Sequence, residues 1–218
     1  MNSMNKQKIV RWLIWAIAIV IIVTIGLAWF FYPEPYDFFN EAISNLGGIN
    51  SETGISNSIS SLIMTIGFSL ISVISFSIFI DYLVTEELTY RFRKATWTLI
   101  LSIGAAGIAI PYDHSSLYFL HYIGAFTFVI SFGGLDFDCQ ALRFFRMRKE
   151  DKHRGKIHIS FDVVFVFIVF AVVILHILTF ILDRVGVSIP DYSVPLTQKI
   201  VLIVNIIAVF LLDVEDMS

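Results

Sequence analysis

Six long apolar stretches divide the sequence and take up most of its length. They cover residues 9–31, 59–84, 95–110, 117–135, 159–182 and 196–212. Each approaches or exceeds the roughly 17–25 residues with which a helix crosses about 30 Å of hydrocarbon. Such runs are too long for barrel strands, and backbone groups in lipid must be paired within their own segment. The pattern predicts an all-α, single-domain bundle of six transmembrane helices.

The polar segments between these stretches carry basic residues very unevenly. Three basic residues lie before or just inside the first stretch, three follow the second and seven follow the fourth, whereas only Arg184 and Lys199 lie at the opposite ends of the stretches. Loops rich in lysine and arginine stay on the cytoplasmic side of a membrane. We therefore predict that both termini are cytoplasmic, and that the membrane is the plasma membrane if the source is a prokaryote.

The composition agrees with an integral membrane protein. Hydrophobic residues make up 57% of the 218 residues and charged residues 15%, which leaves too little polar surface to cover a water-soluble domain. Residues 9–31 exceed the roughly 7–15 apolar residues of a cleavable signal, so we expect a retained span. Cys139 is the only cysteine, which excludes an intrachain disulfide.

Histidines lie inside two of the stretches, where ionisable residues are candidates for a functional site. Neighbouring spans run antiparallel, so His121 and His176 are both expected near the outer surface, together with Asp113 and His114 of a short outer link. These four residues form a candidate outer polar cluster that could bind a zinc-like ion or transfer protons. The alternative, which we favour, is that each histidine is hydrogen-bonded within the bundle, because no two have the compact spacing of a metal-ligand motif. We therefore predict no cofactor.

Other polar residues in the stretches are expected to be structural. Asn205 lies near the middle of residues 196–212, where an amide needs a partner inside the bundle. Carboxylates near the inner ends are expected to form ion pairs with neighbouring basic residues. The carboxylates are Asp81, Asp136, Asp138 and Asp162, and the basic residues are Arg91, Arg93, Lys94 and Lys156.

The first outer loop has internal organisation. Residues 36–43 have apolar positions that suit a short interfacial helix, and residues 45–48, Asn-Leu-Gly-Gly, are expected to end it through a left-handed glycine. Asp37, Asn40 and Glu41 could then belong to a lid over an outward-facing cavity. The alternative, which we favour, is a loop packed against the bundle.

Residues 143–156 form a dense basic segment next to the membrane. Such a segment attracts anionic lipid headgroups by about 1 kcal/mol per basic residue near the surface. Nucleic acid is not an expected partner, because the segment is tied to the bilayer and no appended domain accompanies it. The seven basic residues are Arg143, Arg146, Arg148, Lys149, Lys152, Arg154 and Lys156.

Several short motifs carry a family resemblance. They are the outer element at residues 43–47, Ile-Ser-Asn-Leu-Gly, then Asn57, then residues 107–113, Gly-Ile-Ala-Ile-Pro-Tyr-Asp, and finally His121 leading into residues 124–126. In this order they resemble the domain of unknown function 998 family of six-span membrane proteins. The resemblance implies the six-helix architecture but no reaction. A more distant likeness is to the Frag1/DRAM/Sfk1 group, which implies a link to lipid and membrane trafficking.

Three classes of function follow from these observations. We favour a noncatalytic lipid-associated or membrane-organising protein, whose partners are membrane lipids, a second copy of the chain or another membrane protein. A transporter of a small solute or lipid would need a polar cavity near the midplane, which Asn205 and the serines of residues 59–84 could line. A metal-dependent membrane hydrolase would need the outer polar cluster to converge on a metal that activates water, with Asp37 or Glu41 as base.

Overall fold

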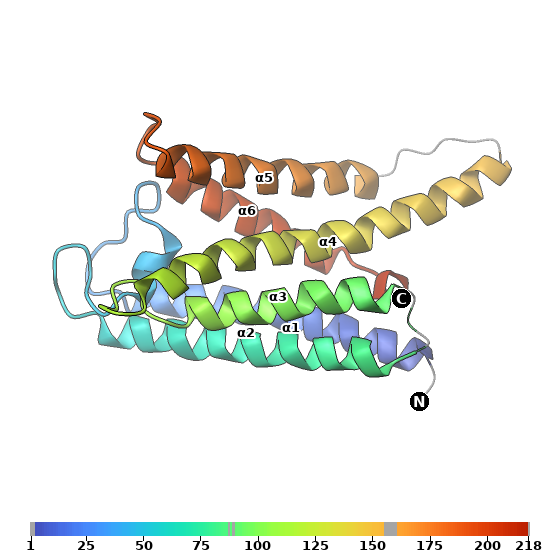
Figure 1. Cartoon of the computed structure of the whole chain (residues 1–218), viewed down its shortest axis with the longest axis horizontal. Helices are drawn as coiled ribbons and strands as arrows, with labels where there is room; N and C mark the ends of the chain where they lie inside the picture. Colours follow the sequence, from blue (N-terminus) through green and yellow to red (C-terminus); the bar gives the residue numbers. More distant parts are fainter. Residues whose placement is uncertain (1–2, 87, 89, 155–160, 218) are drawn as a thin grey trace.

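A computed structural model describes residues 3–86, 88, 90–154 and 161–217; side chains are described outside residues 3, 144 and 146–163. The part described contains six long helices and two short 3₁₀ helices, with no strand (Figure 1). The helices are α1 (Ser3–Phe30), α2 (Ser58–Val84), α3 (Arg91–Ile108), α4 (Tyr118–Arg154), α5 (Phe161–Arg184) and α6 (Ser193–Phe210), and the 3₁₀ helices are η1 (Ile43–Gly47) and η2 (Val214–Met217). The predicted all-α fold is confirmed.

Five of the long helices are long and apolar enough to cross a membrane. They are α1, α2, α4, α5 and α6, with candidate spans at Met4–Phe30, Ser58–Val84, Tyr118–Arg143, Val164–Arg184 and Ser193–Phe210. Helix α3 carries Arg91, Arg93 and Lys94 in its first turn, and it packs against both α2 and α4. The chain therefore has the architecture of a multi-pass membrane protein.

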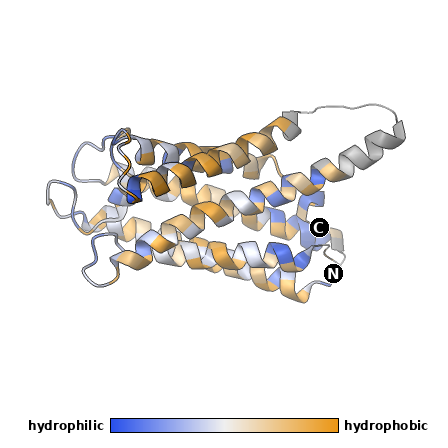
Figure 2. Cartoon of the chain, turned by 45° about the horizontal axis from the view of Figure 1, so that its top comes forward, coloured by the Kyte–Doolittle hydropathy of each residue, from blue (hydrophilic) through white to orange (hydrophobic). Residues whose placement is uncertain are grey.

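The helices form an elongated bundle with two distinct ends (Figure 1). The η1 end holds η1 and the links between α1 and α2, α3 and α4, and α5 and α6. The η2 end holds η2 and both termini. Figure 2 shows hydrophobic residues along the middle of the helices and hydrophilic residues gathered at the two ends, which is the distribution that a bilayer around the middle would require.

The contact between α3 and α4 is a close approach of two backbones. A Cβ atom on Gly124 would lie 2.5 Å from the Cα of Gly107, and one on Gly107 would lie 2.6 Å from the Cα of Gly124. Real side chains do not tolerate such distances, so each position needs glycine. Small residues allow this kind of packing between membrane helices, as the sequence predicts for residues 104–107.

Helix α4 extends far beyond the apolar stretch that predicts it. It contains 37 residues, or about 55 Å of helix at 1.5 Å per residue, whereas the hydrocarbon layer is about 30 Å thick. The stretch at residues 117–135 ends where polar residues begin, but residues such as Gln140 and Leu142 are good helix formers. The apolar stretch therefore marks only the first part of the helix and not its end.

The first loop differs from the predicted interfacial helix at residues 36–43. The Asp37 carboxylate accepts hydrogen bonds from the N–H groups of Phe39 (2.9 Å) and Asn40 (3.2 Å), which closes a turn instead. The helical segment is η1, which begins only at Ile43. The predicted left-handed glycine is also wrong, because Gly48 follows η1 with φ −70°.

The segment η2 closes the opposite end of the bundle. The Asp216 carboxylate accepts hydrogen bonds from Arg143 of α4, and its backbone carbonyl accepts one from the Lys94 ammonium of α3 at 2.5 Å. The hydroxyl of Tyr82 in α2 lies 3.4 Å from the carbonyl of Met217, and η2 also packs against α1. Four helices are thus joined through one short segment.

Candidate functional site

The first loop folds back over the η1 end and is fastened to α2 by its backbone carbonyls. The Asn57 side-chain amide donates to the carbonyls of Leu46 and Gly48, at 3.0 Å each. The hydroxyls of Ser60 and Ser61 donate to carbonyls of the same segment at 2.7 and 3.0 Å. All three donor residues are buried, so η1 is held as a fixed roof over the bundle.

The link between α3 and α4 also holds the first loop in place. The Asp113 carboxylate accepts hydrogen bonds from the N–H groups of Ile49 (2.8 Å) and Asn50 (3.0 Å). The carboxylate of this member of the predicted outer polar cluster is therefore engaged with the backbone of the first loop. An isolated bridge between Asn50 and Ser56 completes this part of the loop.

Helix α6 is the third element that holds the first loop in place. The side-chain oxygen of Gln198 accepts a hydrogen bond from the N–H of Ile43 at 2.9 Å. The ammonium of the next residue, Lys199, donates to the carbonyl of Glu41 at 2.5 Å, although Lys199 is only 3% exposed. Helices α2 and α6 and the α3–α4 link therefore all hold the same loop.

The three residues of the possible lid belong to this loop but differ in their surroundings. Asp37 and Asn40 are exposed, and the hydrogen bond from the Asn40 side chain lowers the pKa of the Asp37 carboxyl. Glu41 is buried, one of its oxygens accepts the Asp37 N–H at 3.0 Å, and burial raises the pKa of its carboxyl. The loop thus covers the bundle through Glu41 and faces outward through Asp37 and Asn40.

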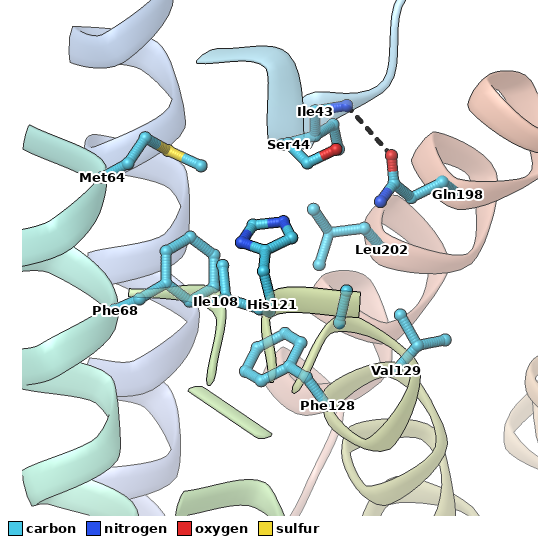
Figure 3. Close-up of a pocket in the computed structure, with 11 residues that line it drawn as sticks. Ile43, Ser44, Met64, Phe68, Ile108, His121, Phe128, Val129, Gln198 and Leu202 are labelled. Carbon is cyan, nitrogen blue, oxygen red and sulfur yellow. Dashed lines mark hydrogen bonds between the residues drawn. The ribbon is translucent and has the colours of Figure 1, made fainter. Parts of the chain in front are cut away.

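A cavity of about 40 Å³ lies directly beneath η1 (Figure 3). Residues from η1, α2, α3, α4 and α6 line it, and eight of the eleven lining side chains are apolar. The ring centroids of Phe68 and Phe128 lie 5.5 Å apart, and both side chains are almost fully buried. The cavity is therefore an apolar chamber that lies between the roof and a packed aromatic floor.

The His121 ring stands inside this cavity with one nitrogen paired and the other unpaired. Its Nδ1 lies 2.5 Å from the carbonyl oxygen of Ile110. A carbonyl can only accept, so Nδ1 carries the proton and Nε2 of the neutral ring is an acceptor. Within the described part of the chain Nε2 has no hydrogen-bond partner, and the residue is 1% exposed.

Two further polar groups face the same space. Figure 3 shows the Nε2 side of the His121 ring turned toward the Ser44 hydroxyl and the Gln198 amide. The Gln198 oxygen is held by Ile43, so its NH₂ group is the end left toward the cavity. Ser44, His121 and Gln198 are the only polar residues among the eleven that line this cavity.

The other members of the predicted outer polar cluster have separate partners. His176 on α5 contacts the hydroxyl of Thr197 on α6 at 3.1 Å, and His114 accepts the N–H of Ser116 at 3.3 Å. Asp113 binds the first loop, and His121 faces the cavity. Among the residues that the structure describes, no three of the His, Cys, Asp and Glu residues are grouped so that they could hold a metal ion.

Arg143 is the one basic residue of the segment at residues 143–156 whose side chain the structure describes. Arg143 is buried, donates to Asp216, and donates from Nη2 to the carbonyl of Leu211 at 2.8 Å. Its guanidinium thus takes part in closing the η2 end. The side chains of the remaining six, Arg146, Arg148, Lys149, Lys152, Arg154 and Lys156, lie outside the described set.

The predicted ion pairs near the inner ends form in one case and fail in another. Asp138 pairs with Arg93 at 2.7 Å, as expected. Asp136 is fully buried, and both of its carboxylate oxygens lack a hydrogen-bond partner in the described part of the chain. Residues two positions apart in a helix point about 200° apart around its axis. Asp136 therefore faces the bundle interior, whereas Asp138 faces Arg93.

Sequence reasoning identified His121 but did not group it with Ser44 and Gln198. Ser44 lies inside the Ile-Ser-Asn-Leu-Gly element, and Gln198 is an uncharged amide near the beginning of α6. A comparison of polar residues by depth below the η1 end, rather than by charge, could have found the set.

No family model, curated protein or solved structure matches this chain.

Proposed function

We propose that this chain is a noncatalytic multi-pass membrane protein that binds a lipid in the cavity beneath η1. The observation that carries the proposal is an apolar chamber whose polar groups all gather under its roof. Ligand sites have this character, with mostly apolar walls and a few polar groups that fix orientation. A lipid supplies the matching apolar body and polar head.

The floor of the cavity favours binding over transport. Phe68 and Phe128 pack against each other at 5.5 Å, and both are at most 3% exposed. A solute that crossed the bundle here would have to separate this pair, since interiors are close-packed. The cavity is therefore suited to hold one end of a ligand.

We further propose that all six long helices cross the membrane and that both termini are cytoplasmic. Helix α3 serves as the sixth span, supported by its position against α2 and α4. Both termini lie at the η2 end (Figure 1), as an even number of crossings requires. The basic first turn of α3 and Arg143 of α4, which bonds to Asp216 of η2, lie at this same end, which supports a cytoplasmic η2 end.

The proposed lipid site can be tested by filling the cavity. Ala125 lines it, and Ala125→Leu adds three carbons to a space of about 40 Å³. The full chain in detergent would be irradiated with a diacylglycerol that carries a photoreactive diazirine on one acyl chain. We expect labelling of the Ala125→Leu variant to fall on the order of tenfold or more, because each carbon the lipid no longer buries is worth about 0.8 kcal/mol.

The matched control is Ala106→Leu, which adds the same group at an exposed position of α3. This variant should be labelled as strongly as the original protein. Equal labelling of both variants, with the peptides of η1, α4 and α6 unlabelled, would overturn the proposed site.

A further inference from the structure

We infer that the lipid held beneath η1 is a lipid alcohol, an apolar molecule with a free hydroxyl that donates a hydrogen bond to His121 Nε2. This inference rests on the proposed lipid-binding function and names its ligand class. Its evidence is the unpaired and buried Nε2 atom that faces the cavity.

The hydrogen bond at Nδ1 decides what His121 can recognise. Because Nδ1–H is committed to the carbonyl of Ile110, Nε2 can act only as an acceptor while the ring is neutral. A second proton would place a positive charge among Met64, Phe68 and Phe128, and burying an unpaired charge is costly. The ligand must therefore supply the donor.

Gln198 and Ser44 also restrict which polar group of the ligand can bind here. The Gln198 oxygen is occupied by the Ile43 N–H, so its NH₂ group can only donate to a ligand. The Ser44 hydroxyl can donate or accept. A ligand group that both donates and accepts therefore satisfies the site best, and a hydroxyl does this with one atom.

Other lipid head chemistries match the site less well. Ester carbonyls, ethers and phosphodiesters only accept, so they would leave Nε2 buried and unpaired, which is unfavourable. An ammonium or a phosphate would bring a charge beside eight apolar side chains, and no buried counter-charge lines the cavity.

The size and depth of the cavity fit a hydroxyl at the end of a larger apolar molecule. About 10–15 Å³ of such volume holds one water-sized group, so 40 Å³ holds a hydroxyl and a few carbons. His121 lies three residues inside α4, or about 5 Å from its beginning. The rest of the ligand would leave past Ala125 and Leu202, which are both half-buried.

The test compares two lipids that differ in one hydroxyl. Both 1,2-dioleoylglycerol and 1,2-dioleoyl-propanediol, which has hydrogen in place of that hydroxyl, would compete with the photoreactive diacylglycerol for the full chain. We expect the alcohol to compete about three- to tenfold more effectively, the effect of one neutral hydrogen bond. Glycerol, a hydroxyl source without an apolar body, should not compete.

Two histidine variants identify the group responsible. In His121→Phe the two lipids should compete equally, whereas His176→Phe, which removes a buried imidazole bonded to Thr197, should keep the preference. Equal competition by both lipids at the original protein would overturn the inference and leave lipid binding intact. Absence of any competition would overturn the proposed function itself. The comparison of lipids at the original protein decides the matter even if a variant fails to fold.

Discussion

Buried hydrogen-bond donors in this protein are paired largely with main-chain carbonyls. Asn57 donates to Leu46 and Gly48, His121 to Ile110, and Lys199 to Glu41. These carbonyls lie in loops or near helix ends, where the last carbonyls of a helix lack intrahelical partners. A single polar side chain can thus hold a loop through the loop's backbone, and no charged partner residue is needed.

Asp136 lacks this kind of pairing, because both of its buried carboxylate oxygens are without a hydrogen-bond partner in the described part of the chain. We predict that Asp136→Leu raises the stability of the protein by about 1–3 kcal/mol, since the unpaired polar group is replaced by an apolar one. The midpoint of thermal unfolding in detergent would measure the change.

Asp138→Leu is the matched comparison two residues away. It removes the ion pair with Arg93, whose side chain is 48% exposed, so stability should fall by no more than about 1 kcal/mol. A lower unfolding midpoint for Asp136→Leu would show that the carboxylate has a stabilising role.

The residues of the cavity show what a sequence can and cannot reveal. His121 stood out because an ionisable residue inside an apolar stretch is rare. Its grouping with Ser44 and Gln198 depends on how η1 lies across α6, and hydropathy carries no information on such contacts. Asp136 and Asp138 have the same charge and nearly the same depth, and only the rotation of α4 separates their environments.

At the scale of the elements, α3 and α4 are positioned by the pair Gly107 and Gly124. We predict that Gly124→Ala lowers stability by about 1–3 kcal/mol, because its Cβ would overlap the Gly107 backbone and force the helices apart. His121 lies one turn before Gly124, so lipid labelling should fall as well. Thermal unfolding and photolabelling of the same sample would measure both effects.

Gly26→Ala is the control for this prediction. Gly26 lies on α1, and a Cβ atom at this position would meet no neighbouring atom within 4 Å, so alanine should be neutral or stabilising by up to about 1 kcal/mol. Equal destabilisation by both substitutions would contradict a specific role for the glycine contact.

Element boundaries were less predictable than the elements themselves. All six apolar stretches coincide with helices, because backbone pairing in lipid leaves few alternatives. The loop over the η1 end was predicted incorrectly as a helix at residues 36–43, since Asp37 bonds to nearby backbone N–H groups and closes a turn. Local side-chain bonds of this kind compete with helix formation.

For the whole molecule, the proposed orientation leads to a labelling pattern. Ser115 lies after α3 and Glu86 before it, and both are exposed. A membrane-impermeant maleimide added to intact cells should label Ser115→Cys, whereas Glu86→Cys should react only after permeabilisation. Cys139 is buried, so background labelling should be low.

This pair of positions also tests whether α3 crosses the membrane. Labelling of both cysteines from the same side would show that it does not. Labelling of Glu86→Cys alone in intact cells would reverse the orientation and place the cavity on the cytoplasmic side.

The position of η2 in the chain sets an order for biosynthesis. The segment follows all six long helices, yet it contacts α1 and bonds to residues of α2, α3 and α4. Ribosomal synthesis delivers it only after α6, so the first four helices are made before the segment that joins them exists. Assembly of this bundle therefore cannot be completed helix by helix, and the earlier spans have to remain together until translation has passed residue 216.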